Sequence, residues 1–199
     1  KTTLCNLIPR FYEVSEGQIL LDGVDIRKIT QKSLRNQIGV VQQDVYLFSG
    51  TVRENIEYGK VGASDEEIVS AAKKAGAHEF IMGLENGYNT YVGERGVKLS
   101  GGQKQRLTIA AAELLQRDVY IFDEPTSGLD GKNMRLIAER MKLLQERQKI
   151  VIIISHDYEF LMESCNKILY LDGQSLKEFS AAHDKEKILE VLQGGEEFP

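Results

Sequence analysis

Apolar residues along the chain form two patterns: short continuous runs and helical spacing of three to four. The runs predict strands and the helical spacing predicts helices. The predicted strands cover residues 18–21, 24–26, 38–41, 119–122, 149–155, 167–171 and 175–179. The predicted helices cover residues 4–12, 68–77, 103–115 and 131–147, with a short charged helix from 183. Because strands and helices alternate, we expect an α/β fold with a mostly parallel sheet flanked by helices.

Several residues mark where these elements begin and end. Pro9 is expected to end or kink the first helix. Ser64 and Glu67 form a capping-box pattern in front of the helix at 68–77. The stretch 86–102 holds five glycines and little periodicity, which predicts a loop.

Composition excludes some classes of protein. The 199 residues are 42% hydrophobic and 28% charged, which is ordinary for a globular domain. The longest aliphatic run, 150–154, is far too short to span a membrane. A net charge of −5 argues against binding nucleic acid through bulk electrostatics. Two cysteines cannot build a disulfide framework, so we expect two reduced thiols, Cys5 and Cys165.

Polar residues follow three of the predicted strands. Asp123 and Glu124 come directly after the apolar strand at 119–122, at the end of the strand where open α/β sheets bind ligands. The first acid could hold Mg²⁺ and the second could polarise an attacking water. His156 and Gln43 follow two other strands. The alternatives are a solvated acidic turn, a capping histidine and an ordinary loop glutamine.

Two further segments suit phosphate. Ser100, Gly101 and Gly102 precede a helix, where glycines allow close backbone approach and free N–H groups favour an anion. The chain opens on Lys1 and Thr2, the lysine–hydroxyl pair that ends a phosphate-binding loop. Each pattern alone also fits a plain helix cap or a chance pair of residues.

The order of these motifs identifies a resemblance. The segments in question are Lys1-Thr2-Thr3, Gln43, Leu99-Ser100-Gly101-Gly102-Gln103, the strand to Asp123-Glu124, Ser127-Gly128-Leu129-Asp130 and His156. Together they resemble the nucleotide-binding domain of ATP-binding cassette (ABC) proteins. The resemblance covers almost the whole chain and implies a P-loop NTPase-type sheet within one domain, 1–199. It also implies an inserted helical subdomain at about 45–115 that carries the LSGGQ signature.

The resemblance assigns roles in hydrolysis. Glu124 resembles the general base that activates water, and His156 resembles the switch histidine. Gln43 resembles the Q-loop glutamine. Thr2, Gln43 and Asp123 are the expected Mg²⁺ ligands.

It also assigns roles in binding ATP. Lys1 and Thr2 resemble the end of Walker A, and Thr3 the next phosphate contact. The signature residues resemble the tip that binds the γ-phosphate on the opposite subunit; they are Ser100, Gly101, Gly102 and Gln103. Asp130 resembles the D-loop aspartate at the dimer interface. In this family two domains enclose two ATP molecules head to tail.

The chain departs from the family pattern in two respects. It begins inside Walker A, so we expect a fragment of a larger protein that binds ATP poorly by itself. The stretches 48–56 and 92–96 resemble exporters, the second being the X-loop that touches their intracellular loops. The sequence beyond Arg106, in particular 124–130 and 155–160, more closely resembles the ATPase subunits of importers.

The favoured interpretation is therefore an ATP-hydrolysing motor of a membrane transporter on the cytoplasmic face of the cell membrane. The membrane-facing loops favour an exporter. Its expected partners are a second ABC ATPase domain and a transmembrane domain, without nucleic acid. The alternatives are a soluble ABC ATPase acting on nucleic acid or ribosomes, an importer ATPase subunit, and a non-catalytic module. The intact Glu124 and His156 argue against the last.

Overall fold

The computed structural model describes residues 2–42, 46–93, 96–172 and 175–192. Its helices are α1 (Thr2–Leu7), α2 (Gln31–Gln37), α3 (Val52–Glu57), α4 (Asp65–Lys74), α5 (His78–Met82), α6 (Gly101–Leu115), α7 (Gly131–Glu146), α8 (Tyr158–Ser164) and α9 (Lys185–Leu192). Its strands are β1 (Leu20–Leu21), β2 (Val24–Asp25), β3 (Ile38–Val41), β4 (Gly50–Thr51), β5 (Tyr91–Val92), β6 (Val119–Asp123), β7 (Ile150–Ile154), β8 (Lys167–Asp172) and β9 (Ser175–Ser180). Short 3₁₀ turns lie at Ile26–Lys28 and Gly87–Asn89.

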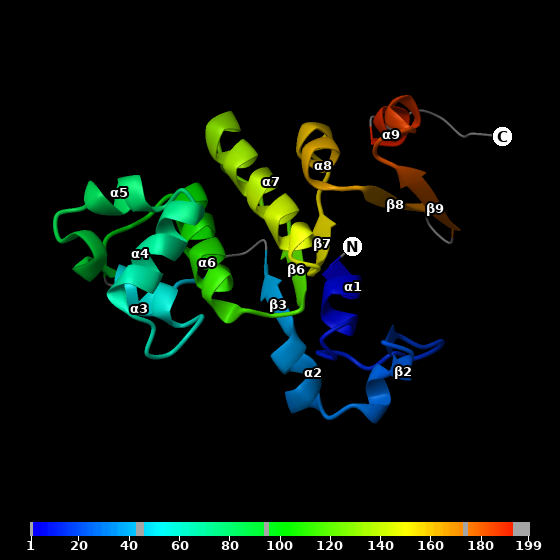
Figure 1. Cartoon of the computed structure of the whole chain (residues 1–199), viewed down its shortest axis with the longest axis horizontal. Helices are drawn as coiled ribbons and strands as arrows, with labels where there is room; N and C mark the ends of the chain where they lie inside the picture. The colour runs from blue at the N-terminus through cyan, green and yellow to red at the C-terminus, as the bar shows by residue number, and fades with distance from the viewer. Residues whose placement is uncertain (1, 43–45, 94–95, 173–174, 193–199) are drawn as a thin grey trace.

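A parallel sheet of β3, β6 and β7 lies at the centre, in the order β3-β6-β7 (Figure 1). Its middle strand, β6, is buried along its whole length. Such continuous burial is what a parallel strand between two layers of helices requires. The fold class predicted from the sequence, α/β with a mostly parallel sheet flanked by helices, is confirmed.

The carboxyl ends of the three strands meet at one edge of this sheet. The register pairs Val41 with Phe122 and Asp123 with Ile154, so the residues that follow each strand leave at the same level. Helix α1 contacts β6 and lies beside β6 and β7 in Figure 1. The three strands therefore end at one common edge of the sheet, as the sequence patterns predicted.

The short helices α3, α4 and α5 gather away from the sheet (Figure 1). Both α3 and α4 contact α6, and α6 also contacts β3. One apolar core runs from Val52 and Ile56 through Leu107 to Phe122 and Ile137. Helix α6 thus connects the helical group with the sheet, and its first residues are the signature.

A second apolar cluster lies around β6 and α1. It comprises Cys5, Ile26, Leu34, Ile38, Val119 and Ile121. Both cysteines are free, as expected, with Cys5 buried and Cys165 half-buried. Burial raises the pKa of the Cys5 thiol to about 11, and the nearby Asp123 carboxylate adds to the effect.

Some predicted boundaries were wrong. Helix α1 ends at Leu7 rather than residue 12, because Pro9 follows and Arg10 takes a left-handed backbone with φ of 54°. The expected loop 86–102 contains β5, and α6 begins at Gly101 instead of residue 103. The helix expected at 68–77 begins at Asp65 and ends at Lys74.

The sequence reading also missed four short helices, α2, α3, α5 and α8. They have five to seven residues, too few for a helical period to stand out. Caps were the available signal. Thr51 and Glu54 complete a capping box on α3, and Asp157 accepts a hydrogen bond from the Phe160 N–H at the start of α8.

At the C-terminal end, β8 and β9 form the predicted antiparallel hairpin, followed by the predicted charged helix α9. None of the helices in the described ranges is both long enough and apolar enough to cross a bilayer.

Candidate functional site

Two carboxylates stand at the end of β6. Asp123 is the last residue of the strand and is 5% exposed. Glu124 turns the chain out of the sheet with φ of 48°, a left-handed conformation that is uncommon outside glycine. Its N–H donates to the Ile154 carbonyl at 2.8 Å, which ties the turn to β7. The strand end therefore holds one acid buried and positions the next one beside β7.

The Glu124 side chain meets His156. The Oε1 atom lies 3.0 Å from Nδ1 of the histidine, with side-chain exposures of 13% for Glu124 and 79% for His156. Ser155, which precedes the histidine, is buried and its hydroxyl accepts from the Asp157 N–H at 3.1 Å. A sheltered carboxylate bonded to one ring nitrogen of an accessible imidazole can accept a proton from water and orient a group in front of it.

The remaining predicted residues of this edge are only partly described. Lys1 and Gln43 lie outside the described residues, although β3 brings the chain to this edge directly before Gln43. Thr2 is the first residue of α1, and Thr3 is exposed in its first turn. Because Cys5, one turn further on, lies within electrostatic range of Asp123, α1 runs close to the acidic strand end.

The expected Mg²⁺ ligands form an all-oxygen set of a hydroxyl, an amide carbonyl and a carboxylate, from Thr2, Gln43 and Asp123. Oxygen donors of this kind, with few protein ligands and several waters, suit Mg²⁺. Among the described residues there is no cluster of three or more His, Cys, Asp or Glu that could hold a metal by itself. The chemistry of the donor set therefore fits a magnesium ion shared with a phosphate rather than a closed protein cage.

The signature begins α6. The Ser100 hydroxyl accepts from the Gln103 N–H at 3.3 Å, and the Gln103 amide oxygen accepts from the Ser100 N–H at 2.9 Å. This capping box leaves the O–H of Ser100 and the NH₂ of Gln103 available as donors. Ser100 and Gly101 are exposed, and a Cβ built on Gly101 meets nothing within 4 Å. The tip is therefore open to an approaching ligand.

Asp130 caps the next long helix, α7. Its carboxylate accepts from the backbone N–H of Asn133 at 2.9 Å and from the Asn133 amide at 2.9 and 3.0 Å. The backbone hydrogen bond from Asn133 is the main reason why the pKa of Asp130 lies below its ordinary value, and the charge of Arg106 lowers it further. Sequence reasoning gave Asp130 a role but missed Asn133, whose i+3 spacing from a capping aspartate was the available signal.

The structure brings some predicted residues together and keeps others apart. Glu124 and His156, 32 residues apart, are in contact. Within the described ranges, no hydrogen bond or ion pair joins Ser100 or Gly101 to that pair. The signature does touch the 124–130 loop through Gly102, since a Cβ on Gly102 would lie 2.3 Å from the Gly128 carbonyl oxygen. That backbone contact left no mark in the sequence pattern.

Comparison with known proteins agrees with this geometry. A putative multidrug export ATP-binding/permease protein of Staphylococcus aureus is 51% identical over 178 residues, which cover 89% of this chain and 30% of that protein. An uncharacterized ABC transporter ATP-binding protein of Bacillus subtilis, YwjA, is 48% identical over 175 residues, or 80% of this chain and 30% of the relative. The chain thus spans about a third of the length of these relatives.

Structure and family comparison point the same way. A solved bacterial Atm1-family ABC exporter with ATP bound matches with a TM-score of 0.89 at 39% identity, over 98% of this chain and 35% of that one. The family model described as ABC transporter matches residues 1–127, which is more than half of the chain. The motif order, the parallel sheet and these matches together show that the chain belongs to the ABC transporter family.

Proposed function

We propose that this chain is the ATP-hydrolysing motor domain of an ABC exporter. The observation that carries the proposal is the contact of Glu124 with His156 at the carboxyl edge of the sheet. The family match and the exporter relatives support it. We treat residues 1–199 as one ATPase domain in which about 45–115 forms a helical subdomain around the signature.

In this proposal Glu124 accepts a proton from the water that attacks the γ-phosphate. A positioned carboxylate base contributes about 10²- to 10⁴-fold to such a step. His156 holds the carboxylate through Nδ1, and its exposed ring is available to contact the terminal phosphate. The left-handed backbone at Glu124 and its hydrogen bond to β7 fix the position of the base at the end of β6.

The cofactors of this site are ATP and Mg²⁺. Lys1 and Thr3 would contact phosphate, and Thr2, Gln43 and Asp123 would hold Mg²⁺. When bound, the ion offsets the negative charge that builds up on the transferring phosphoryl group. The chain supplies these donors from three segments of its sequence: its first residues, the segment after β3 and the end of β6.

A second ABC ATPase domain completes each site. Ser100, Gly101, Gly102 and Gln103 of one chain contact the γ-phosphate that the other chain holds, and Asp130 lies at the interface between them. The open Gly101 and the spare donors of the signature support this arrangement, because a tip whose groups are not all used within its own chain can bind a ligand. The homodimer and the heterodimer are both compatible with it.

The other partner is a transmembrane domain, which places the motor at the cytoplasmic face of the cell membrane.

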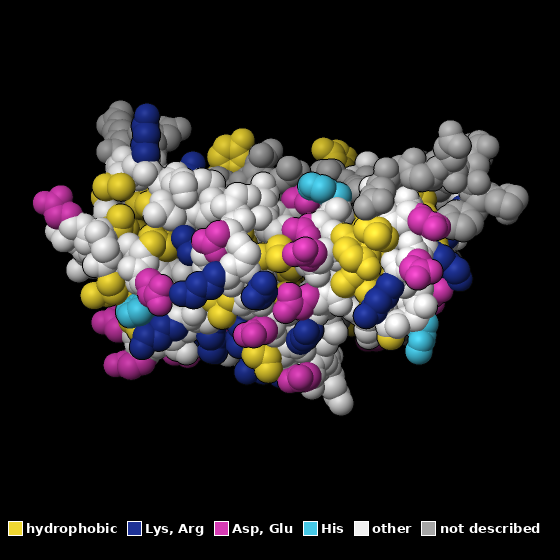
Figure 2. Space-filling view, turned by 90° about the horizontal axis from the view of Figure 1, so that it is seen from above, with side chains coloured by type: hydrophobic (Ala, Val, Ile, Leu, Met, Phe, Trp, Pro, Cys, Tyr) yellow, Lys and Arg dark blue, Asp and Glu magenta, His cyan; other side chains and the backbone are white. Residues whose placement is uncertain are grey.

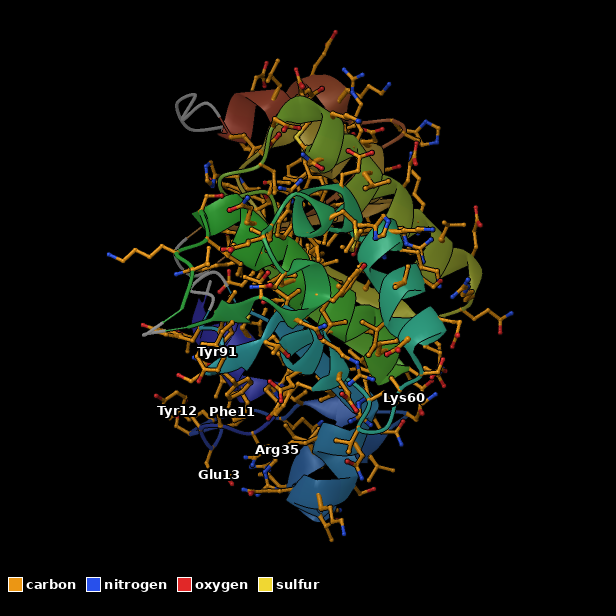
Figure 3. The ribbon with its side chains drawn as sticks, turned by 90° about the vertical axis from the view of Figure 1, so that its left-hand side faces the viewer. Phe11, Tyr12, Glu13, Arg35, Lys60 and Tyr91 are labelled. Atoms are coloured by element: carbon orange, nitrogen blue, oxygen red, sulfur yellow. The ribbon has the colours of Figure 1, made fainter. Side chains whose placement is uncertain are left out.

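Exposed aromatic side chains support a docking surface near the exporter-like stretches. The rings of Phe48 and Tyr58 are in contact, with centroids 4.5 Å apart and planes tilted by 36°, yet both side chains stay more than half exposed. Tyr91 is 49% exposed on β5, which pairs with β4 two residues after Phe48. Figure 3 shows Tyr91 on the same side of the molecule as Phe11 and Tyr12.

This docking surface can be tested in the full-length protein. Replacing Phe48 by Ser is expected to lower the stimulation of ATP hydrolysis by transported substrate about tenfold, since an interface aromatic commonly contributes that much. Val61→Ser is the control, because Val61 is an aliphatic residue that is 91% exposed. Equal stimulation in both variants contradicts docking at Phe48.

A role on nucleic acid receives less support. The chain carries 30 acidic against 25 basic residues. On the face seen in Figure 2, acidic and basic side chains are interspersed rather than gathered into a basic band. Binding of a DNA or RNA duplex that weakens steeply with added salt contradicts this conclusion.

The proposed function is tested by Glu124→Gln in the full-length protein. Removing the base is expected to cut kcat about a hundredfold or more and to trap the ATP-bound dimer. The control is Glu146→Gln, an exposed acid on α7 without an ion pair in the described part of the chain. Steady-state hydrolysis and dimer content by size-exclusion chromatography are the measurements. Wild-type turnover in Glu124→Gln refutes the proposal.

A further inference from the structure

Asn55 on α3 is a buried polar side chain, 7% exposed, that binds the backbone of the segment leading into its own helix. Its Oδ1 accepts from the Phe48 N–H at 2.9 Å. Its Nδ2 donates to the carbonyl oxygens of Phe48 at 3.0 Å and of Thr51 at 2.9 Å. Both amide hydrogens are therefore used, and the side chain binds both backbone polar groups of Phe48.

This pairing resembles that of a neighbouring strand. A carboxamide carries a carbonyl oxygen and N–H groups, so it can pair with the N–H and C=O of one residue, as a residue opposite in an antiparallel strand does. Strand β4 begins at Gly50, two residues after Phe48, and pairs with β5. Asn55 thus extends the hydrogen-bonded part of the backbone from Gly50 back to Phe48.

The same helix also contacts the ring of Phe48. Asn55 and Tyr58, which directly follows the last residue of α3, are three residues apart and lie on one face of the helix. The ring centroids of Phe48 and Tyr58 are 4.5 Å apart, and the two residues are 58% and 66% exposed. Phe48 is therefore held at its backbone by a buried amide and at its ring by an exposed aromatic, while much of its ring faces solvent.

A segment ordered in this way is suited to bind a partner. A flexible segment loses conformational entropy when it becomes ordered against a partner, whereas a segment that is already ordered loses much less. Asn55 is itself almost inaccessible, so its effect on binding would pass through Phe48.

We propose that Asn55 is a positioning residue for docking: its amide orders the Phe48 backbone and so presents the ring to the partner. The inference rests on the proposed function, in which Phe48 docks on a transmembrane domain. It goes further than that function because it assigns the ordering of the docking segment to one buried side chain.

The test measures docking of position 48 in the full-length protein. The photoreactive aromatic residue p-benzoylphenylalanine replaces Phe48, and mass spectrometry after irradiation gives the yield of cross-links to peptides outside residues 1–199. The measurement is repeated with Asn55→Asp. This variant keeps the Oδ1 acceptor, removes both Nδ2 donors and places a carboxylate oxygen beside two carbonyl oxygens.

Gln145→Glu is the matched control. The Gln145 amide on α7 donates to the carbonyl of Ser164, the last residue of α8, at 2.8 Å. This variant therefore also exchanges an amide donor for a carboxylate oxygen beside a backbone carbonyl, in a different part of the fold. Thermal unfolding of each variant gives Tm, which separates a loss of docking from a loss of stability.

We expect Asn55→Asp to lower the cross-link yield about tenfold, because the ordered conformation of the segment loses two hydrogen bonds. Gln145→Glu is expected to lower Tm and to leave the yield unchanged. If Asn55→Asp does not fold, Asn55→Ala replaces it, because alanine removes the amide without burying a charge.

Two results overturn the inference and leave docking at Phe48 intact. They are an unchanged cross-link yield in the Asn55 variant, and an equal fall in yield in the Asn55 and Gln145 variants. Absence of cross-links outside residues 1–199 while Asn55 is present overturns docking at Phe48, and the inference with it. Absence of ATP hydrolysis by the wild-type protein is a separate result, and it overturns the proposed motor function.

Discussion

The two polar regions of this molecule are built in opposite ways. At the sheet edge, the contact of Glu124 with His156 joins residues 32 positions apart, and it exists only because β6 and β7 pair in parallel. At the signature, the hydrogen bonds of Ser100 close on Gln103, three residues further along the same helix. One region is assembled by the tertiary fold, and the other is a local capping motif.

Their exposure differs in the same sense. Asp123 is buried and Glu124 nearly so, whereas Ser100 and Gly101 face solvent. A site assembled within one chain can exclude water from its acidic side chains. An exposed helix start such as the signature is instead accessible to a ligand held by another chain. In the proposed function, the first region therefore supplies the base of a reaction centre and the second completes the site of the opposite chain.

The largest effect on stability is expected from the buried ion pair between α6 and α7, which holds the signature helix against the helix that follows the acidic loop. Arg140 donates to both oxygens of Glu113 at 2.8 and 3.1 Å, and their side chains are 10% and 6% exposed. Arg140→Ala removes both hydrogen bonds to the buried Glu113 carboxylate and leaves it beside Lys74, whose Nζ is 3.9 Å away. It is therefore expected to lower the free energy of unfolding by about 3 kcal/mol.

Chemical denaturation measures this loss. Arg135→Ala is the control on the same helix, since Arg135 is exposed and forms no ion pair in the described part of the chain; it should change stability by about 0.5 kcal/mol or less. Replacing both Arg140 and Glu113 by Met should recover most of the loss. A similar small change for both arginines would show that the pair does not hold α6 to α7.

A smaller effect separates the two neighbouring glycines of the signature. Gly102→Ala pushes a methyl group into the Gly128 carbonyl and is expected to destabilise the fold by about 1 to 3 kcal/mol. Gly101→Ala enters open space and is expected to be neutral or slightly stabilising, because alanine favours helix by up to about 1 kcal/mol over glycine. Thermal unfolding of the two variants distinguishes them, and equal Tm values would argue that the close contact with Gly128 is absent.

The smallest expected effect on stability distinguishes a serine that only caps a helix from a serine that also binds ATP. Ser100 and Ser64 each complete a capping box, on α6 and α4. Serine-to-alanine changes at both should cost about 1 kcal/mol of stability. Only Ser100→Ala is expected to raise the KM for ATP and remove cooperativity in the full-length protein. A KM that rises equally in Ser64→Ala would mean that the signature hydroxyl acts through helix stability alone.

The sequence predicted the regular elements well where they were long or fully apolar. The strand at Ile38–Val41 and the hairpin of β8 and β9 lie where the pattern placed them, and the capping box at Ser64 is present. Short helices such as α3 were missed, because five or six residues give no periodic signal. The first helix was predicted to be too long, because the helical spacing of apolar residues continues past Pro9 although the helix itself ends at Leu7.

The sequence by itself determined which chemical groups this chain offers, because the polar residues after each strand and the order of the motifs can be read from it directly. Only the tertiary structure decided which distant groups meet: Glu124 with His156, and Gly102 with Gly128. The physical reason is that strand register and backbone approach depend on packing between distant segments. A local pattern can place a residue at the end of a strand, but it cannot say which neighbour lies within 3 Å of it.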